Sequence, residues 1–195
     1  MALEFTIIIA SWMRRLSKAG TPGAAMIESA GELTSEEALW HFSLAFYSRP
    51  GVSQALIALQ DRASCDVNLM LFAVWLGISG RSRLTNDKLA IADQIIAPIT
   101  ADIVKPLRAL RRKLRSDPDG DIQRLREDIK ALELAAERIV QSRLARIAGS
   151  PGGDADPSRR AAAAYENLVL YLGPKHAHSS EAATIEEALT AFVRE

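Results

Sequence analysis

The segment from Val67 to Ile78 constrains the fold of this chain more than any other. Apart from Trp75, only Asn68 in it carries a side chain with polar hydrogen-bonding atoms, so a helix built from it is apolar on every face and must be surrounded by other elements. The segment is about twelve residues long, whereas a membrane-spanning helix needs ~20. The pattern therefore predicts a central core helix, capped by Asp66 at its start and ended by Gly77 or Gly80.

The patterns on both sides of this segment indicate an all-α fold, a helical bundle around the central helix. Thr34–Glu37 has the form of a capping box and starts a first helix. Apolar residues at helical spacing then follow in 52–63, after Pro50. A fourth helix starts at Thr85 and continues into an arm that contains Pro98 and Pro106. Because each proline removes an N–H donor, we expect this arm to be kinked or split.

The arm is followed by a strong turn and a second long helix. Ser116–Gly120 is rich in Asp, Pro and Gly. After it, apolar residues recur at alternating steps of three and four, the seam of a coiled coil: Ile122, Leu125, Ile129, Leu132, Ala136 and Ile139. We therefore expect an antiparallel, coiled-coil-like hairpin.

The composition fits one globular domain with tails. Of 195 residues, 48% are hydrophobic and 25% are charged. We expect a loosely ordered extension over residues 1–33, in which Met26 is an alternative start, and a helical domain over 34–172 with a flexible connection at 149–157. Ser158 is expected to start a helix that Gly173 and Pro174 end, and residues 173–195 form a loop and a short last helix that starts at Thr184.

The net charge and the cysteine content limit the partners and the cellular location that we expect for this protein. The formal net charge is zero, so no overall field favours nucleic acid or an anionic membrane, and a nucleic-acid partner is not expected. Cys65 is the single cysteine, which fits a reducing compartment and a cytoplasmic location. No transmembrane segment or export signal is expected, because the arginines of the N-terminal region follow its apolar run.

Several short motifs resemble a bacterial family of small conserved hypothetical proteins, a domain of unknown function. They include Tyr47-Ser48-Arg49-Pro50-Gly51-Val52, Asp66-Val67-Asn68-Leu69-Met70-Leu71, Pro106-Leu107-Arg108-Ala109-Leu110-Arg111 and Glu133-Leu134-Ala135-Ala136-Glu137-Arg138. The resemblance runs from about Glu37 to Leu172 and implies no activity, because none is attached to the family.

One polar cluster precedes the central helix. Gln60, Asp61, Asp66 and Asn68 gather amide and carboxylate groups there, and a ligand pocket of a helical enzyme or small-molecule binder would need such groups. The alternative is structural: Asp66 caps the helix, Asp61 pairs with an arginine, and Asn68 satisfies backbone groups at a bend. The sequence favours the structural alternative, since short polar clusters between helices usually serve turns and caps.

A second cluster is basic: Lys105, Arg108, Arg111, Arg112 and Arg115 lie on one short arm. It could contact an anion, RNA, anionic lipid or a partner protein. Acidic residues on the next helix, Glu133 and Glu137 among them, lie within reach of an antiparallel partner. A solvated, charge-complementary hairpin is therefore the favoured interpretation.

No catalytic pattern stands out. The paired aspartate-rich motifs of an isoprenoid-synthase-like enzyme and the Glu-x-x-His repeats of a di-iron bundle are absent from the sequence. His176 and His178 alone cannot hold a metal, and Cys65 has no evident histidine partner. We therefore expect no cofactor, no metal and no catalytic residue. The sequence favours a helical interaction protein that binds a partner protein or a second copy through the hairpin.

Overall fold

The computed structural model describes residues 33–194 except residues 82 and 153–155, and this part of the chain contains helices and no strand. The prediction of an all-helical protein is confirmed. Most of the expected extension over residues 1–33 lies outside the described residues. The elements are α2 (Ser35–Tyr47), α3 (Val52–Ala63), α4 (Val67–Ile78), α5 (Asn86–Ile99), the π-helical turn η2 (Thr100–Val104), α6 (Lys105–Lys113), the 3-10 turn η3 (Leu114–Ser116), α7 (Gly120–Arg146), α8 (Pro157–His176) and α9 (Ser180–Phe192).

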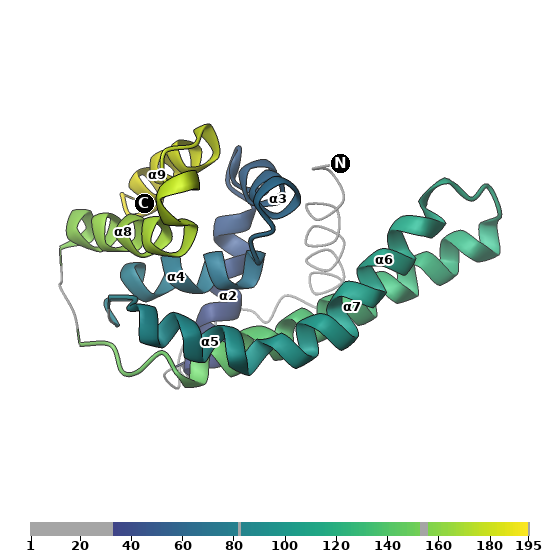
Figure 1. The fold of residues 1–195 in the computed structure, drawn as a ribbon, viewed down its shortest axis with the longest axis horizontal. Helices are drawn as coiled ribbons and strands as arrows, with labels where there is room; N and C mark the ends of the chain where they lie inside the picture. Colours follow the sequence, from purple (N-terminus) through teal and green to yellow (C-terminus); the bar gives the residue numbers. More distant parts are fainter. Residues whose placement is uncertain (1–32, 82, 153–155, 195) are drawn as a thin grey trace, which may run out of the picture.

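Helix α4 lies at the centre of the bundle (Figure 1). Every residue of α4 from Val67 to Gly77 is buried. Its start is fixed by Asp66, whose carboxylate accepts the backbone N–H groups of Asn68 and Leu69, as the sequence predicts. A fully apolar helix is stable only where its side chains are removed from water. Burying one large apolar side chain contributes about 1.5–3 kcal/mol to the free energy of folding.

Helix α8 packs closest on α4. At Gly77 the two backbones come so near that a Cβ atom would lie 2.2 Å from the backbone nitrogen of Ala164. Asn167 of α8 adds a polar link: its amide donates to the carbonyl of Ala73 at 3.0 Å and accepts the N–H of Leu84 at 2.7 Å. The amide thereby joins α8 to the central helix and to the segment that leads into α5.

The arm that carries the two prolines is one long rod with a wider turn in the middle. Pro98 lies inside α5 and Pro106 in the first turn of α6, and between them Thr100–Val104 is a π-turn. In a π-turn each backbone N–H donates to the carbonyl five residues before it, one residue further back than in an α-helix. The expected irregularity is therefore local, and the rod continues through it.

The rod and α7 lie side by side and form a hairpin that extends away from the rest of the bundle (Figure 1). At its tip, the Gln123 amide donates to the carbonyl oxygens of Leu114 and Asp117 at 3.0 and 2.6 Å. Asp119 caps α7. The tip is therefore closed by hydrogen bonds to backbone groups that a helix end leaves open.

The C-terminal third differs from the sequence-based expectation in its boundaries. The cap of α8 is Asp156, two residues before the expected Ser158. The predicted break at Gly173 is present, because the backbone there is non-helical, with φ 66° and ψ 174°, and a further helical stretch follows it up to His176. Helix α9 starts at Ser180 and not at Thr184, because the Ser179 hydroxyl accepts the N–H of Ala182. Its Phe192 packs edge-on against Phe42 and Phe46 of α2, so this helix belongs to the core.

Candidate functional site

The hairpin joins the bundle through a cluster of arginine and glutamate side chains. Arg108 of α6 donates from Nε to Glu133 Oε1 at 2.8 Å, from Nη2 to Glu137 Oε1 at 2.5 Å, and from Nη1 to the Gln60 side-chain oxygen at 2.8 Å. It therefore bonds to α7 and α3 at once. We call Arg108, Arg111, Glu133 and Glu137 the Arg-Glu cluster.

The Arg-Glu cluster is buried. Arg111 donates from Nε to Glu133 Oε2 at 2.5 Å, and the side chains of Arg111 and Glu133 are only 8% and 3% exposed. The predicted charge complementarity of the two arms is present, but the prediction that these charges are solvated is wrong for the cluster. The reason is geometric: the cluster residues occupy the inner face of the hairpin, where residues of α2 and α3 also lie.

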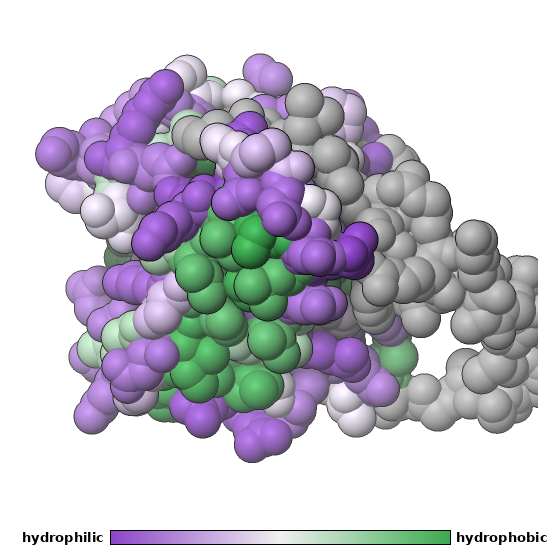
Figure 2. All heavy atoms as spheres, turned by 90° about the vertical axis from the view of Figure 1, so that its right-hand side faces the viewer, coloured by the Kyte–Doolittle hydropathy of each residue, from purple (hydrophilic) through white to green (hydrophobic). Residues whose placement is uncertain are grey.

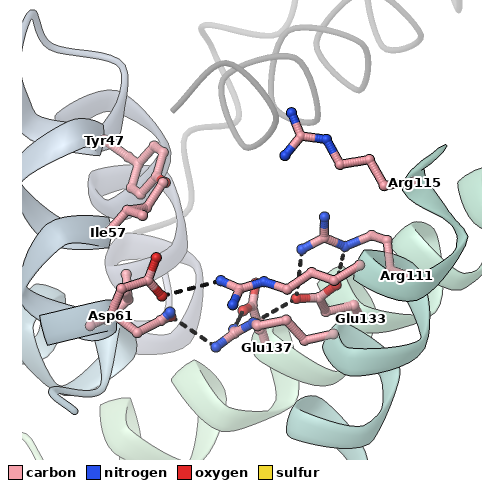
Figure 3. Close-up of a pocket in the computed structure, with 11 residues that line it drawn as sticks. Tyr47, Ile57, Asp61, Arg111, Arg115, Glu133 and Glu137 are labelled. Atoms are coloured by element: carbon pink, nitrogen blue, oxygen red, sulfur yellow. Dashed lines mark hydrogen bonds and ion pairs between the residues drawn. The ribbon is translucent and has the colours of Figure 1, made fainter. Parts of the chain in front are cut away.

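A small cavity of about 60 Å³ lies beside the cluster (Figure 3). It is lined by the cluster residues together with Tyr47, Ile57, Gln60, Asp61, Val67, Arg112 and Arg115. Asp61 at its rim accepts a hydrogen bond from Arg112 at 3.2 Å. The cavity has room for a few water molecules or one small anion, so the cluster is a polar interior and not a sealed core.

Burial changes the proton affinity of the cluster. Loss of hydration raises the pKa of Glu137 from its usual value to about 7, and the contact with Arg108 only partly opposes this. Burial alone would lower the pKa of Arg108, but Glu137 and Glu133 outweigh it and raise the pKa. Burial also raises the pKa of the nearby Tyr47 phenol. Glu137 therefore titrates near neutral pH.

The raised pKa of Glu137 predicts a pH dependence of stability. The unfolded carboxyl titrates near its ordinary value of 4.5 and the folded one near 7, so the folded state holds more protons in between. The contribution of this group is fully present below about pH 4.5 and is lost as the pH rises through 7. We expect it to lower the free energy of unfolding by up to about 1.4 kcal/mol per pH unit between pH 5 and 7.

Urea denaturation of wild type and Glu137→Gln at pH 5, 6 and 7 measures this slope. Glutamine mimics the protonated carboxyl, so the variant should be less dependent on pH over this range, whatever its absolute stability. Equal slopes in the two proteins would contradict the assignment of the proton to Glu137.

A larger cleft lies on the other side of Arg108. It has a volume of about 810 Å³ and runs along α5 and η2, opposite the α3–α4 corner and Tyr171 of α8. Its lining residues include Gln60, Cys65, Asp66, Leu69, Leu89, Asp93, Ile96, Thr100, Lys105, Arg108 and Tyr171. The cleft has the size of a small-molecule site.

The structure separates the residues of the predicted polar cluster. Gln60 lines both hollows, Asp61 lines the small cavity, and Asp66 caps α4 while it also lines the cleft. Asn68 lies elsewhere: its buried side-chain oxygen accepts the Gln141 amide of α7 at 3.1 Å. It links two helices and does not serve a bend, so the predicted structural role of Asn68 is wrong.

The structure also places the residues of the basic arm at different sites. Arg108 and Arg111 belong to the buried cluster, Arg112 and Arg115 line the small cavity, and Lys105 lines the cleft. Sequence reasoning did not identify Tyr47, Asp93 or Tyr171 as residues of either hollow. No local motif marks them, because each comes from a different helix.

The hairpin also carries an apolar stripe on its outer flank. Five large apolar side chains there are 44–58% exposed: Ile103, Leu110, Leu125, Leu132 and Ile139. They recur at steps of seven on each arm, so each set lies on one side of its helix. We call them the hairpin stripe. The predicted heptad seam is thus only partly internal, because Ile129 and Ala136 are buried while Leu125, Leu132 and Ile139 are not.

Figure 2, which looks at the molecule from the side of the hairpin, shows a continuous hydrophobic area bordered by hydrophilic residues. Apolar patches of this kind on a folded protein usually mark an interaction surface.

None of the helices in the described residues is long and apolar enough to cross a membrane. Within these residues, no group of three or more His, Cys, Asp or Glu side chains could hold a metal ion.

These features define a small all-helical protein with a buried ionic cluster, two hollows and an apolar hairpin flank. Residues 38–144 match the family described as Protein of unknown function (DUF2390), and the chain belongs to this family. No curated protein and no solved structure matches the chain. The match confirms the resemblance drawn from the sequence motifs over residues 38–144, short of the expected Leu172, and supplies no activity.

Proposed function

We propose that this protein is a non-catalytic interaction protein of the cytoplasm, and that the hairpin stripe is its contact surface. The observation that carries the proposal is the exposure of five large apolar side chains at heptad spacing on one hairpin. The cytoplasmic location rests on the single cysteine, Cys65, which is a free thiol.

The stripe on α7 fits a second copy of itself. Leu132 lies midway between Leu125 and Ile139, so two antiparallel α7 helices that cross at Leu132 place Leu125 of each copy against Ile139 of the other. The same symmetry places Asp121 opposite Arg143, a pair of opposite charges, and both residues are exposed. An isologous contact requires this kind of self-complementarity. Helix α7 spans about 40 Å, which is long enough for an interface of standard size.

The basic arm supports the rival proposal of an RNA or anionic-lipid surface less well. Arg108 and Arg111 hold buried carboxylates, and Arg112 pairs with Asp61. A phosphate backbone would have to compete with these carboxylates. The rival would regain support if the protein bound RNA or anionic vesicles with an affinity that fell steeply with added salt.

The test is the mass of the full chain in solution. Wild type should form a dimer as its concentration rises, measured by sedimentation equilibrium. Leu132→Lys places two ammonium groups against each other at the symmetry point and should weaken the dimer at least about 30-fold, the scale of a hot-spot residue. Leu170→Lys is the matched control, because Leu170 is an exposed leucine of α8, outside the hairpin, and it should leave the dimer intact.

Exchanging the charges at positions 121 and 143 tests whether the two α7 helices are antiparallel in the dimer. Asp121→Arg should weaken the dimer, and adding Arg143→Asp to it should restore most of the affinity. A monomeric wild type at all concentrations, or a Leu132→Lys variant that dimerises like wild type, would overturn self-association through the stripe.

A further inference from the structure

The cleft along α5 has the features of a binding site that is independent of the hairpin stripe. We infer that it binds an elongated amphoteric small molecule, with a protonated amine at the Asp66–Asp93 end and an oxyanion, carboxylate or phosphate, at the Lys105 end. The inference rests on how charge, hydrogen-bonding capacity and apolar surface are distributed along its walls.

Apolar residues line much of the cleft. Leu69 and Leu89 are among them, and Ile96, Ala97 and Ala101 lie between Asp93 and Lys105 along the rod. A volume of about 810 Å³ suits a small organic molecule. An apolar floor between polar ends favours a ligand whose charges are at its ends and not in its middle.

One end is acidic. Asp93 of α5 and Asp66 both line the cleft, and Asp93 is exposed. The Tyr171 hydroxyl accepts the backbone N–H of Asp66 at 2.7 Å and donates no hydrogen bond to the described residues. Burial raises the pKa of Tyr171; the hydrogen bond from the Asp66 backbone opposes this rise, and the charges of the two aspartates add to it. Two carboxylates beside a neutral phenol form a favourable environment for an ammonium group.

The other end is basic. Lys105 is exposed and forms no hydrogen bond or ion pair within the described residues. Arg108 next to it makes three hydrogen bonds, to Gln60, Glu133 and Glu137, while a guanidinium group has five N–H donors. The remaining donors and the lysine can hold an oxyanion. Asp93 and Lys105 are twelve positions apart on one rod, which corresponds to about 18 Å of helix axis.

The π-turn lies between the two ends. Thr100, at its start, lines the cleft and is 9% exposed, and its hydroxyl has no hydrogen-bond partner in the described part of the chain. A buried hydroxyl without a partner costs free energy unless a ligand or water satisfies it, and π-turns occur frequently at functional sites. Both observations favour a site over a merely structural hollow.

Isothermal titration calorimetry with the full chain tests the inference. The probes are 6-aminohexanoate, 8-aminooctanoate, 11-aminoundecanoate and 6-aminohexyl phosphate, with hexylamine, undecylamine and hexanoate as probes that carry one charge. At least one two-charge probe should bind, and it should bind about tenfold or more tightly than its one-charge counterpart. The phosphate probe tells which oxyanion the basic end prefers.

Two substitutions test which end of the cleft binds the amine and which end binds the oxyanion. Asp93→Asn should weaken the two-charge probes about tenfold and leave hexanoate unchanged, whereas Lys105→Gln should weaken them similarly and leave the amines unchanged. Asp102→Asn and Lys113→Gln are the matched controls, since both residues are exposed and neither lines the cleft. No binding by any probe, or binding that both cleft variants leave intact, would overturn the inference.

Discussion

Replacing Glu133 with alanine should lower the free energy of unfolding by about 3–5 kcal/mol. Glu133 is 3% exposed and accepts hydrogen bonds from both Arg108 and Arg111. Its removal leaves two poorly hydrated guanidinium groups with one buried carboxylate between them. Breaking a buried pair is costly for this reason, even where the intact pair adds little net stability. Urea denaturation of the full chain at pH 7 measures the loss.

The matched control is Glu166→Ala. A control that removes a carboxylate of α7, Glu127→Ala, is unsuitable because Glu127 pairs with Arg126 and with Lys130, which is buried at 8% exposure. Glu166 of α8 pairs with Arg83 at 2.9 Å, and the two side chains are 51% and 76% exposed. An exposed pair of this kind contributes about 0–1 kcal/mol. Losses of similar size in the two variants would show that the Arg-Glu cluster does not hold the hairpin to the bundle.

Replacing Gly77 with alanine should cost about 3 kcal/mol or more, the upper end of what overpacking a core costs. The new Cβ would lie 2.2 and 2.4 Å from the backbone N and Cα of Ala164. Backbone atoms cannot rotate away as a side chain can, so α4 and α8 must separate along part of their contact. Thermal and urea denaturation should both show the loss, although alanine by itself favours a helix.

Gly120→Ala provides the comparison. Gly120 is the first residue of α7, and no atom lies within 4 Å of a Cβ built there. The substitution should change stability by no more than about 0.5 kcal/mol. If Gly77→Ala were as stable as Gly120→Ala, the close approach of α4 and α8 would not be a feature of the folded protein.

Some of this fold could be predicted from the sequence because the relevant signals are local. The burial of α4 follows from a segment with almost no polar side chain, and the caps at Thr34, Asp66 and Thr85 follow from hydroxyl and carboxylate groups just before apolar runs. The expected start of the last helix at Thr184 is wrong, because the cap is Ser179. Thr184 lies inside the helix, where its hydroxyl donates to the carbonyl of Ser180.

The interior of the hairpin could not be predicted in the same way. Leucines at heptad spacing identify a side of α7, but Glu133 and Glu137 follow the same period one position away from Leu132 and Ala136. Charged residues are usually solvated, so the apolar set was the better choice for the inside. The structure buries the polar set, since Arg108 and Arg111 supply partners from the other arm. Gln60 and Asp66 were candidates for a pocket and do line the cleft, but its other walls could not be predicted because they come from segments far apart in sequence.

The π-turn at Thr100–Val104 sets the rotational phase between the two halves of the proline-containing rod. Each helical residue advances the side-chain direction by about 100°, so the orientation of α6 about its own axis depends on the number of residues in that turn. Shortening the turn by one residue would swing Arg108 and Arg111 away from their glutamates and turn Ile103 and Leu110 away from the outer flank. One turn of backbone thus coordinates the ionic cluster, the cleft and the apolar surface.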